Sequence, residues 1–141
     1  MSEIVTMKLG PRKPVRHEPL PEGGYREFIG WKEGMSPVDV WHAGNSWWKI
    51  EPGRAVRCDL AIILNPYNVV VCVARIRGLI KRKDMRMGFI GEPIDGTYDA
   101  WLGKILDRNN SKNPIAYFDE MDILAPSKVK PDTKFLNLDR Q

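Results

Sequence analysis

The sequence predicts an α+β fold, a small mainly-β barrel or sandwich with one or two short helices and extended termini. Several short runs of β-branched and aromatic residues are separated by Gly, Pro or Asn, and only one segment has strong helix signals. The length of 141 residues suits one domain. We divide the chain into an extended Pro/Arg-rich arm over 1–24, a β-barrel domain over 25–124 and a polar tail over 125–141.

The predicted arm is defined by its prolines. Pro11, Pro14, Pro19 and Pro21 lie among basic residues, and each proline removes a backbone donor that a strand ladder would need. We therefore expect residues 1–24 to be extended and outside the compact domain. Prolines and polar residues after position 125 predict a second loosely held segment.

The clearest helix signal begins at Ser36. Its hydroxyl can cap free N–H groups, Pro37 suits the first helical position, and Asp39 favours the positive end of a helix. We expect the helix to end near Gly44. Residues 45–50 then predict a short strand.

A hairpin from about 59 to 80 is the surest element of the core. Two apolar runs, 60–64 and 69–73, flank the turn sequence Asn-Pro-Tyr-Asn. Side chains alternate along a strand, so one face of the second strand should carry every other residue from Val70 through Ile76. Arg75 and Arg77 then share the opposite face.

Three weaker elements follow the hairpin. Residues 87–90 predict a strand that Gly91 ends. Residues 97–106 predict a short helix around Tyr98 and Trp101, and residues 115–118 predict a last strand.

The net charge and the pI of the chain favour an anionic binding partner. The formal net charge is +4 and the pI is near 9.1, although 22 basic residues only modestly outnumber 18 acidic ones. Cys58 and Cys72 lie in apolar surroundings, as structural reduced cysteines do, and a disulfide between them would need neighbouring strands. We find no signal-peptide pattern and no apolar run long enough to span a bilayer, and we expect a cytoplasmic protein with no membrane role.

The densest functional signal is the basic segment over 75–86. It sets six cations against one acid, which suits contact with phosphates. The alternative interpretation is a solvated loop that keeps a strand end from aggregating. The six candidate phosphate-binding residues are Arg75, Arg77, Lys81, Arg82, Lys83 and Arg86.

The second signal is a group of tryptophans, Trp41, Trp47 and Trp48. Bases stack on such rings, and an aromatic pocket can hold a flipped base. Adjacent residues of a strand point to opposite faces, so Trp47 and Trp48 cannot both fill one core, and one of them is expected at a surface pocket. The alternative is that all three belong to the core.

Nothing in the sequence assembles a catalytic or metal site. His17 and His42 lack a nucleophile or a second ligand nearby, and the acids Asp119, Glu120 and Asp122 lack partner ligands. We therefore predict no catalytic residues, no metal and no cofactor.

The order of these features resembles the PUA-like superfamily, in particular its small EVE- and ASCH-type bacterial and phage-borne domains. The resemblance lies in residues 40–50, with the pair Trp47-Trp48, in residues 73–76, and in the segment Arg-Met-Gly-Phe-Ile-Gly over 86–91. It implies a twisted β-barrel that binds RNA or DNA, sometimes through a modified base in an aromatic pocket. It also implies Trp47 or Trp48 at the pocket, and Asn45 and Ser46 bonded to a base edge. Gly44 and Asn45 depart from the family, where a basic residue often precedes the tryptophans.

The leading functional hypothesis is a non-catalytic nucleic-acid-binding module that recognises a modified or flipped base. The alternative is a small protein-interaction regulator or phage-borne inhibitor, suggested by the two proline-bearing tails. A nuclease or base-processing enzyme would need converging acids or a histidine pair. The sequence distinguishes neither DNA from RNA nor one base from another.

Overall fold

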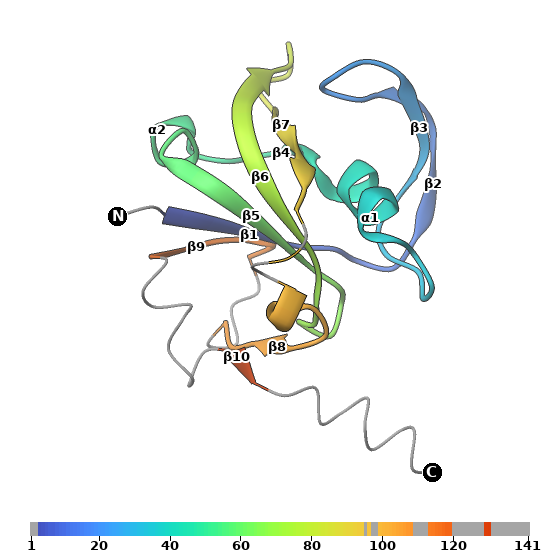
Figure 1. Cartoon of the computed structure of the whole chain (residues 1–141). Coiled ribbons are helices and arrows are strands. Elements are labelled where there is room, and N and C mark those ends of the chain that lie inside the picture. Colours follow the sequence, from blue (N-terminus) through green and yellow to red (C-terminus); the bar gives the residue numbers. More distant parts are fainter. Residues whose placement is uncertain (1–2, 95, 97–98, 109–112, 120–128, 131–141) are drawn as a thin grey trace.

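The computed structural model describes residues 3–94, 96, 99–108, 113–119 and 129–130. Its main element is a six-stranded sheet that curls into a half-barrel (Figure 1), in the order β4-β7-β6-β5-β1-β9. These strands are β1 (Glu3–Lys8), β4 (Ser46–Trp48), β5 (Cys58–Leu64), β6 (Val70–Lys81), β7 (Met87–Pro93) and β9 (Ile115–Asp119). The mainly-β fold with short helices agrees with the predicted α+β class.

Two small two-stranded sheets and short helices complete the described fold. β2 (Lys13–Pro19) pairs with β3 (Tyr25–Ile29), and β8 (Ile105–Leu106) pairs with β10 (Val129–Lys130). The helices are α1 (Pro37–Gly44), α2 (Pro52–Ala55) and a 3₁₀ turn (Asp99–Trp101). In Figure 1, the β2–β3 hairpin lies beside α1.

The prediction that residues 1–24 form an arm outside the compact domain is wrong for β1. This strand lies between β5 and β9, parallel to the first and antiparallel to the second. Ile4, Val5 and Met7 are fully buried. Burial of a strand's apolar residues on both faces stabilises it inside a sheet, so residues 3–8 belong to the core of the domain.

Two of the four prolines in the predicted arm also lie in a strand. β2 contains Pro14 and Pro19, and within the described residues it pairs only with β3, with a register shift between Pro14 and Glu18. A proline is tolerated in such a strand because an edge leaves some N–H positions without ladder partners. Residues 13–19 are therefore part of a hairpin.

The hairpin predicted over 59–80 is confirmed as β5 and β6. Asn65 closes its turn, since the Asn65 Oδ1 atom accepts hydrogen bonds from the N–H groups of Tyr67 (2.9 Å) and Val69 (3.0 Å). A register shift follows Ile63, where Leu64 pairs with Val70. Val70 consequently packs in a different core cluster from Cys72, which corrects the uniform alternation expected from Val70 onward.

The two faces of the sheet support two core clusters. Ala61, Ile63 and Phe89 face the cluster that contains α1, where Trp41 is buried and its Nε1 donates to the Gly91 carbonyl (3.1 Å). The opposite cluster contains Leu60, Ile62, Leu64, Val70, Val73 and Leu106, with Trp101 packed against it. Trp101 is thus part of the core on the side opposite α1.

Helix α1 begins and ends as the sequence predicts. Ser36 is the N-cap, and its Oγ accepts the N–H of Asp39 (3.2 Å). The strand expected over 45–50 is shorter, as β4 occupies three residues. Helix α2, capped by Glu51, was not predicted.

The remaining predictions are partly confirmed. β9 matches the predicted last strand, and β7 extends the strand predicted over 87–90. Where a helix was expected over 97–106, the described residues form one 3₁₀ turn and β8. Of the predicted tail, only Val129 and Lys130 lie within the described residues, and they pair with β8.

Both cysteines are buried and free. Burial raises the pKa of each thiol, Cys58 and Cys72, to about 12. They are structural residues of the core, as expected, and the disulfide alternative does not hold.

Candidate functional site

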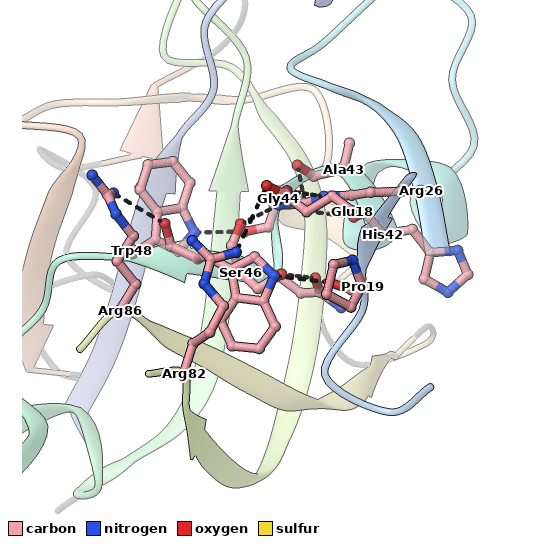
Figure 2. A network of polar contacts seen from close by, with 12 residues as sticks. Glu18, Pro19, Arg26, His42, Ala43, Gly44, Ser46, Trp48, Arg82 and Arg86 are labelled. Atoms are coloured by element: carbon pink, nitrogen blue, oxygen red, sulfur yellow. Dashed lines mark hydrogen bonds and ion pairs between the residues drawn. The ribbon is translucent and has the colours of Figure 1, made fainter. Parts of the chain in front are cut away.

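A cavity of about 500 Å³ lies between the β2–β3 hairpin, the end of α1, β4 and the turn that joins β6 to β7. Figure 2 shows the polar contacts among residues of this region, including Arg26, Ser46 and Arg82. Cavities of this size hold small organic groups. Its lining combines two tryptophans, five cations and one acid with small and apolar residues: Lys8, Leu9, Gly10, Pro11, Lys13, Glu18, Arg26, Ile29, Gly30, Ala43, Ser46, Trp47, Trp48, Arg82, Arg86 and Pro114.

Trp47 and Trp48 both contribute to the cavity wall. The Nε1 of Trp47 donates to the Pro19 carbonyl (2.8 Å), and the Nε1 of Trp48 donates to the Gly44 carbonyl (2.8 Å). Both rings are half-buried. Because their N–H donors are already used, the indoles offer a ligand ring surface rather than a hydrogen bond.

The irregular pairing of β4 explains why two adjacent tryptophans reach one cavity. Ser46 pairs with Gly88, whereas Trp48 pairs with Met87, so the register shifts within three residues. Strict alternation would send neighbouring side chains to opposite faces. The sequence predicts one tryptophan at a surface pocket, whereas both Trp47 and Trp48 line this cavity.

Two arginines from the β6–β7 turn contact Trp47. The guanidinium carbon of Arg82 lies 4.9 Å from the ring centroid, and Nη1 of Arg86 donates to the Trp47 carbonyl (3.4 Å). Arg82 is thus within the range of a cation–π interaction. One cation therefore lies at the indole ring and the other at the backbone of the same residue.

Asp84 fixes these two arginines. Its carboxylate accepts from Arg82 Nη2 at 2.6 Å and lies 3.8 Å from Arg86 Nε. The hydrogen bonds from Arg82 lower the pKa of Asp84 from its ordinary value of 3.8 to about 2, and the N–H of Arg86 contributes in the same direction. The carboxylate is therefore ionised, and it orders the turn that carries both cations.

Arg26 joins the β2–β3 hairpin to the floor of the cavity, with a side chain that is only 6% exposed. Its Nε and Nη2 donate to Glu18 Oε1 (2.8 and 2.5 Å), and its Nη1 donates to the carbonyls of His42 (2.8 Å) and Ala43 (3.2 Å). Nη2 also donates to the Ser46 carbonyl (2.8 Å). All five N–H groups of the guanidinium are used, and burial lowers its pKa.

Glu18 connects this buried pair to the turn cations. Its second oxygen, Oε2, lies 3.8 Å from Nη1 of Arg82. Two arginines therefore share one carboxylate, whereas Lys8 and Lys13 have no ion-pair partner within the described residues. The lining retains an excess of positive charge, which favours an anionic ligand.

The structure brings together five of the predicted binding residues. Ser46, Trp47, Trp48, Arg82 and Arg86 line the cavity. The Ser46 hydroxyl donates to Asn45 Oδ1 (3.1 Å), so its hydrogen is already used within the protein. These residues come from two segments some 35 positions apart, which β4 and β7 place side by side.

Two predicted residues lie in the interior instead. Trp41 and Asn45 are each 2% exposed, and neither lines the cavity. Trp41 is part of the core because α1 packs its apolar face on the sheet, and the backbone of Asn45 pairs with Phe89 (2.7 Å). We leave both out of the proposed interface.

The other four predicted cations are exposed away from the cavity. Arg77 forms an ion pair with Glu92 (2.5 Å), and Glu92 is the cross-strand partner of Arg75. Lys81 and Lys83 are exposed, and neither lines the cavity. The basic segment thus divides, with only Arg82 and Arg86 reaching the tryptophans.

Sequence reasoning missed the contributions of the first 26 residues. Lys8, Lys13, Glu18 and Arg26 all line the cavity. The prolines around Lys13 and Glu18 predict an isolated arm over 1–24, which also includes Lys8, whereas Arg26 lies in the predicted domain without any local signal of its role. The β-branched run at Ile4–Thr6 was the available signal that this region is folded into the sheet.

The described residues contain no assembled metal or histidine site. No three His, Cys, Asp or Glu side chains among them could hold a metal ion. His17 stacks on Tyr25 and pairs with Glu27 (3.1 Å), while exposed His42 contributes only its carbonyl to Arg26. Asp119 lies in β9, and Glu120 and Asp122 lie outside the described residues.

Comparisons add no relative. No family model, curated protein or solved structure matches the chain. Among the described residues, no helix has the length and apolar character needed to cross a membrane.

Proposed function

We propose that the protein is a nucleic-acid-binding module that holds an unpaired base in the cavity beside Trp47 and Trp48. The observation that carries this proposal is the juxtaposition of two half-buried indole rings with Arg82 and Arg86 in one cavity. Bases stack on aromatic rings at a gain of roughly 1–3 kcal/mol each, and arginine binds phosphate oxygens.

The chemistry of the lining supports a nucleotide over other anions. A simple inorganic anion would use the cations but not the ring faces, whereas a purely apolar ligand would leave the cations without a partner. A nucleotide satisfies both. The resemblance to the PUA-like superfamily points in the same direction, since those domains bind RNA or DNA and sometimes hold a modified base.

The basis for the protein-interaction alternative is reduced. It depended on two polar tails, and residues 3–8 and 13–19 of the first tail form β1 and β2. Arg26 then ties the β2–β3 hairpin to α1 and β4. The hairpin forms one wall of the cavity, so it supports binding at this site.

A salt titration tests the proposal. Binding of a fluorescently labelled single-stranded oligonucleotide is measured by anisotropy from about 50 to about 200 mM salt, for the wild type and for Arg82→Gln/Arg86→Gln. Each phosphate contact on a single strand contributes roughly 0.7 to the slope of log affinity against log salt. We expect the double variant to lose up to about 1.4 of that slope.

The matched control is Arg75→Gln/Arg77→Gln. It removes the same number of positive charges as the cavity variant. Both substituted residues lie in β6, the strand that leads into the turn with Arg82 and Arg86, but outside the cavity. We expect this control to retain at least half of the wild-type affinity. An absence of binding, binding indifferent to salt, or an equal loss in both double variants would reject the proposed function.

A further inference from the structure

A second cleft lies on the β2–β3 hairpin next to the cavity. Its volume is about 600 Å³, and it is formed by the start of β2 and the end of β3 with the residues that follow. The residues that matter for its chemistry are Arg12, Lys13, Glu27, Phe28, Trp31 and Lys32. It shares one residue, Lys13, with the cavity described above.

The cleft repeats the combination of rings and cations found in the cavity. The guanidinium carbon of Arg12 lies 3.3 Å from the centroid of the Phe28 ring, so the guanidinium covers that ring. Trp31 meets Tyr67 edge-to-face, with centroids 6.5 Å apart, and is half-buried. A base can stack on the exposed plane of the guanidinium or on the Trp31 ring.

The cations of the cleft have no carboxylate partner within the described residues, unlike the three arginines of the cavity. Arg12, Lys13 and Lys32 are exposed and form no ion pair within the described residues, whereas Glu27, the acid of the cleft, is paired with His17. Arg82, in contrast, is already bound to Asp84. The unpaired cations are therefore available to phosphates at a smaller desolvation cost.

We infer that the ligand is a single-stranded nucleic acid whose chain runs from the Trp47–Trp48 cavity across Lys13 into this second cleft. The inference rests on the proposed function and names the substrate class for it. In a duplex, neighbouring base pairs cover the faces of the bases, so even a single flipped base would use only one aromatic site. Two aromatic sites with a shared cation suit two unpaired bases of one strand.

The test compares three double variants on one labelled single strand of about 12 nucleotides, a length that spans a typical single-strand site. The first, Arg12→Gln/Lys32→Gln, alters only the second cleft. The second, Arg82→Gln/Arg86→Gln, alters only the cavity. The control, Lys49→Gln/Arg57→Gln, removes two exposed charges that lie outside both sites.

We expect the cleft variant and the cavity variant each to bind the single strand roughly 10-fold more weakly than the control, with a salt slope reduced by up to about 1.4 in each case. We also expect a duplex of the same sequence to bind the wild type at least roughly 10-fold more weakly than the single strand, since its bases are not free to stack. The substituted residues of the cleft, Arg12 and Lys32, are exposed, so folding should be retained.

The remaining outcomes separate the two proposals. A cleft variant that equals the control, with a weakened cavity variant, overturns the inference and leaves the proposed function standing. A duplex that binds as tightly as the single strand also overturns it. If the cavity variant equals the control, the proposed function fails, and the continuous path fails with it.

Discussion

Buried Arg26 and half-buried Glu18 form an ion pair in which Nε of the guanidinium and Oε1 of the carboxylate are 2.8 Å apart. The guanidinium also holds three backbone carbonyls, from His42, Ala43 and Ser46. One side chain thus connects the β2–β3 hairpin, the end of α1 and β4. These three elements carry half of the residues that line the cavity, so the pair holds much of the proposed site in place.

Replacing Arg26 by alanine should destabilise the fold by about 3–5 kcal/mol, because the change leaves a carboxylate and three carbonyls without their donor. Arg26→Lys should recover only part of this loss, since an ammonium cannot reproduce the fork of five donors. Urea unfolding monitored by circular dichroism measures both. The exposed Arg16, on β2 of the same hairpin, provides the control, and Arg16→Ala should change stability by less than about 0.5 kcal/mol. Equal losses at the two positions would contradict the role assigned to Arg26.

Gly91 is required where β7 passes close to β6. A Cβ at this position would overlap the carbonyl oxygen of Arg75, and the Gly91 carbonyl accepts the Nε1 hydrogen of Trp41. Gly91→Ala should therefore cost about 1–3 kcal/mol or more, since the backbone must move. A Cβ added to Gly78, in β6, would meet no atom within 4 Å, so Gly78→Ala should be neutral or up to about 1 kcal/mol stabilising. Thermal unfolding of the pair tests this, and a similar cost at both glycines would argue against the close approach.

The sequence was informative where structure depends on near neighbours. The cap at Ser36 and the turn at Asn65 are local hydrogen-bonding patterns, and both were recognised along with the elements they start or join. β1 was missed because its partner, β5, lies more than 50 residues away and is parallel to it. The only local signal of this strand is the short β-branched run at Ile4–Thr6, and it does not identify the partner strand.

Only part of the candidate site could be predicted from the sequence, because some of its contacts also join segments that are far apart in the chain. Trp47, Trp48, Arg82 and Arg86 were proposed from their residue types, but the buried role of Arg26 depends on carbonyls at the end of α1. Composition also could not separate Arg75 from Arg82. That distinction arises because Arg75 pairs with Leu60 and Glu92 in the middle of the sheet, whereas Arg82 follows the end of β6, where Met87 and Gly88 of β7 pair with β4.

The contribution of Asp84 to stability should be lost in acid, between about pH 4 and about pH 2. Its folded-state pKa, about 2, lies below its ordinary value of 3.8, so protonation favours the unfolded chain. The contribution of Asp84 is fully present above about pH 4, the ordinary range of an aspartate, and is lost as the pH falls through about 2. An NMR titration of its carboxyl carbon should report the low pKa directly. Arg82→Gln should return the pKa toward 3.8, whereas Arg77→Gln, which removes a cation bound to Glu92, should not change it. An unchanged pKa in Arg82→Gln would exclude the proposed cause.

Trp41 and Trp47 allow stability and binding to be separated. Trp41 is fully enclosed in the core, so Trp41→Ala should cost about 3–5 kcal/mol in the free energy of unfolding. Trp47 lines the cavity, with one hydrogen bond to Pro19 and a contact with Arg82, so Trp47→Ala should cost only about 1–2 kcal/mol. Its main effect should be on single-strand affinity, which we expect to fall by about 1–3 kcal/mol, or roughly 5- to 150-fold.

Urea unfolding and anisotropy titration of the same preparations measure the two quantities. Trp41→Phe serves as the conservative control, because it keeps an aromatic ring in the core and removes the Nε1 hydrogen bond to Gly91. That variant should bind the single strand as the wild type does, since Trp41 does not line the cavity. An unchanged affinity in a folded Trp47→Ala variant would exclude stacking in the cavity as the source of binding. The rings of Trp47 and Trp48 would then contribute only to the packing of the β2–β3 hairpin.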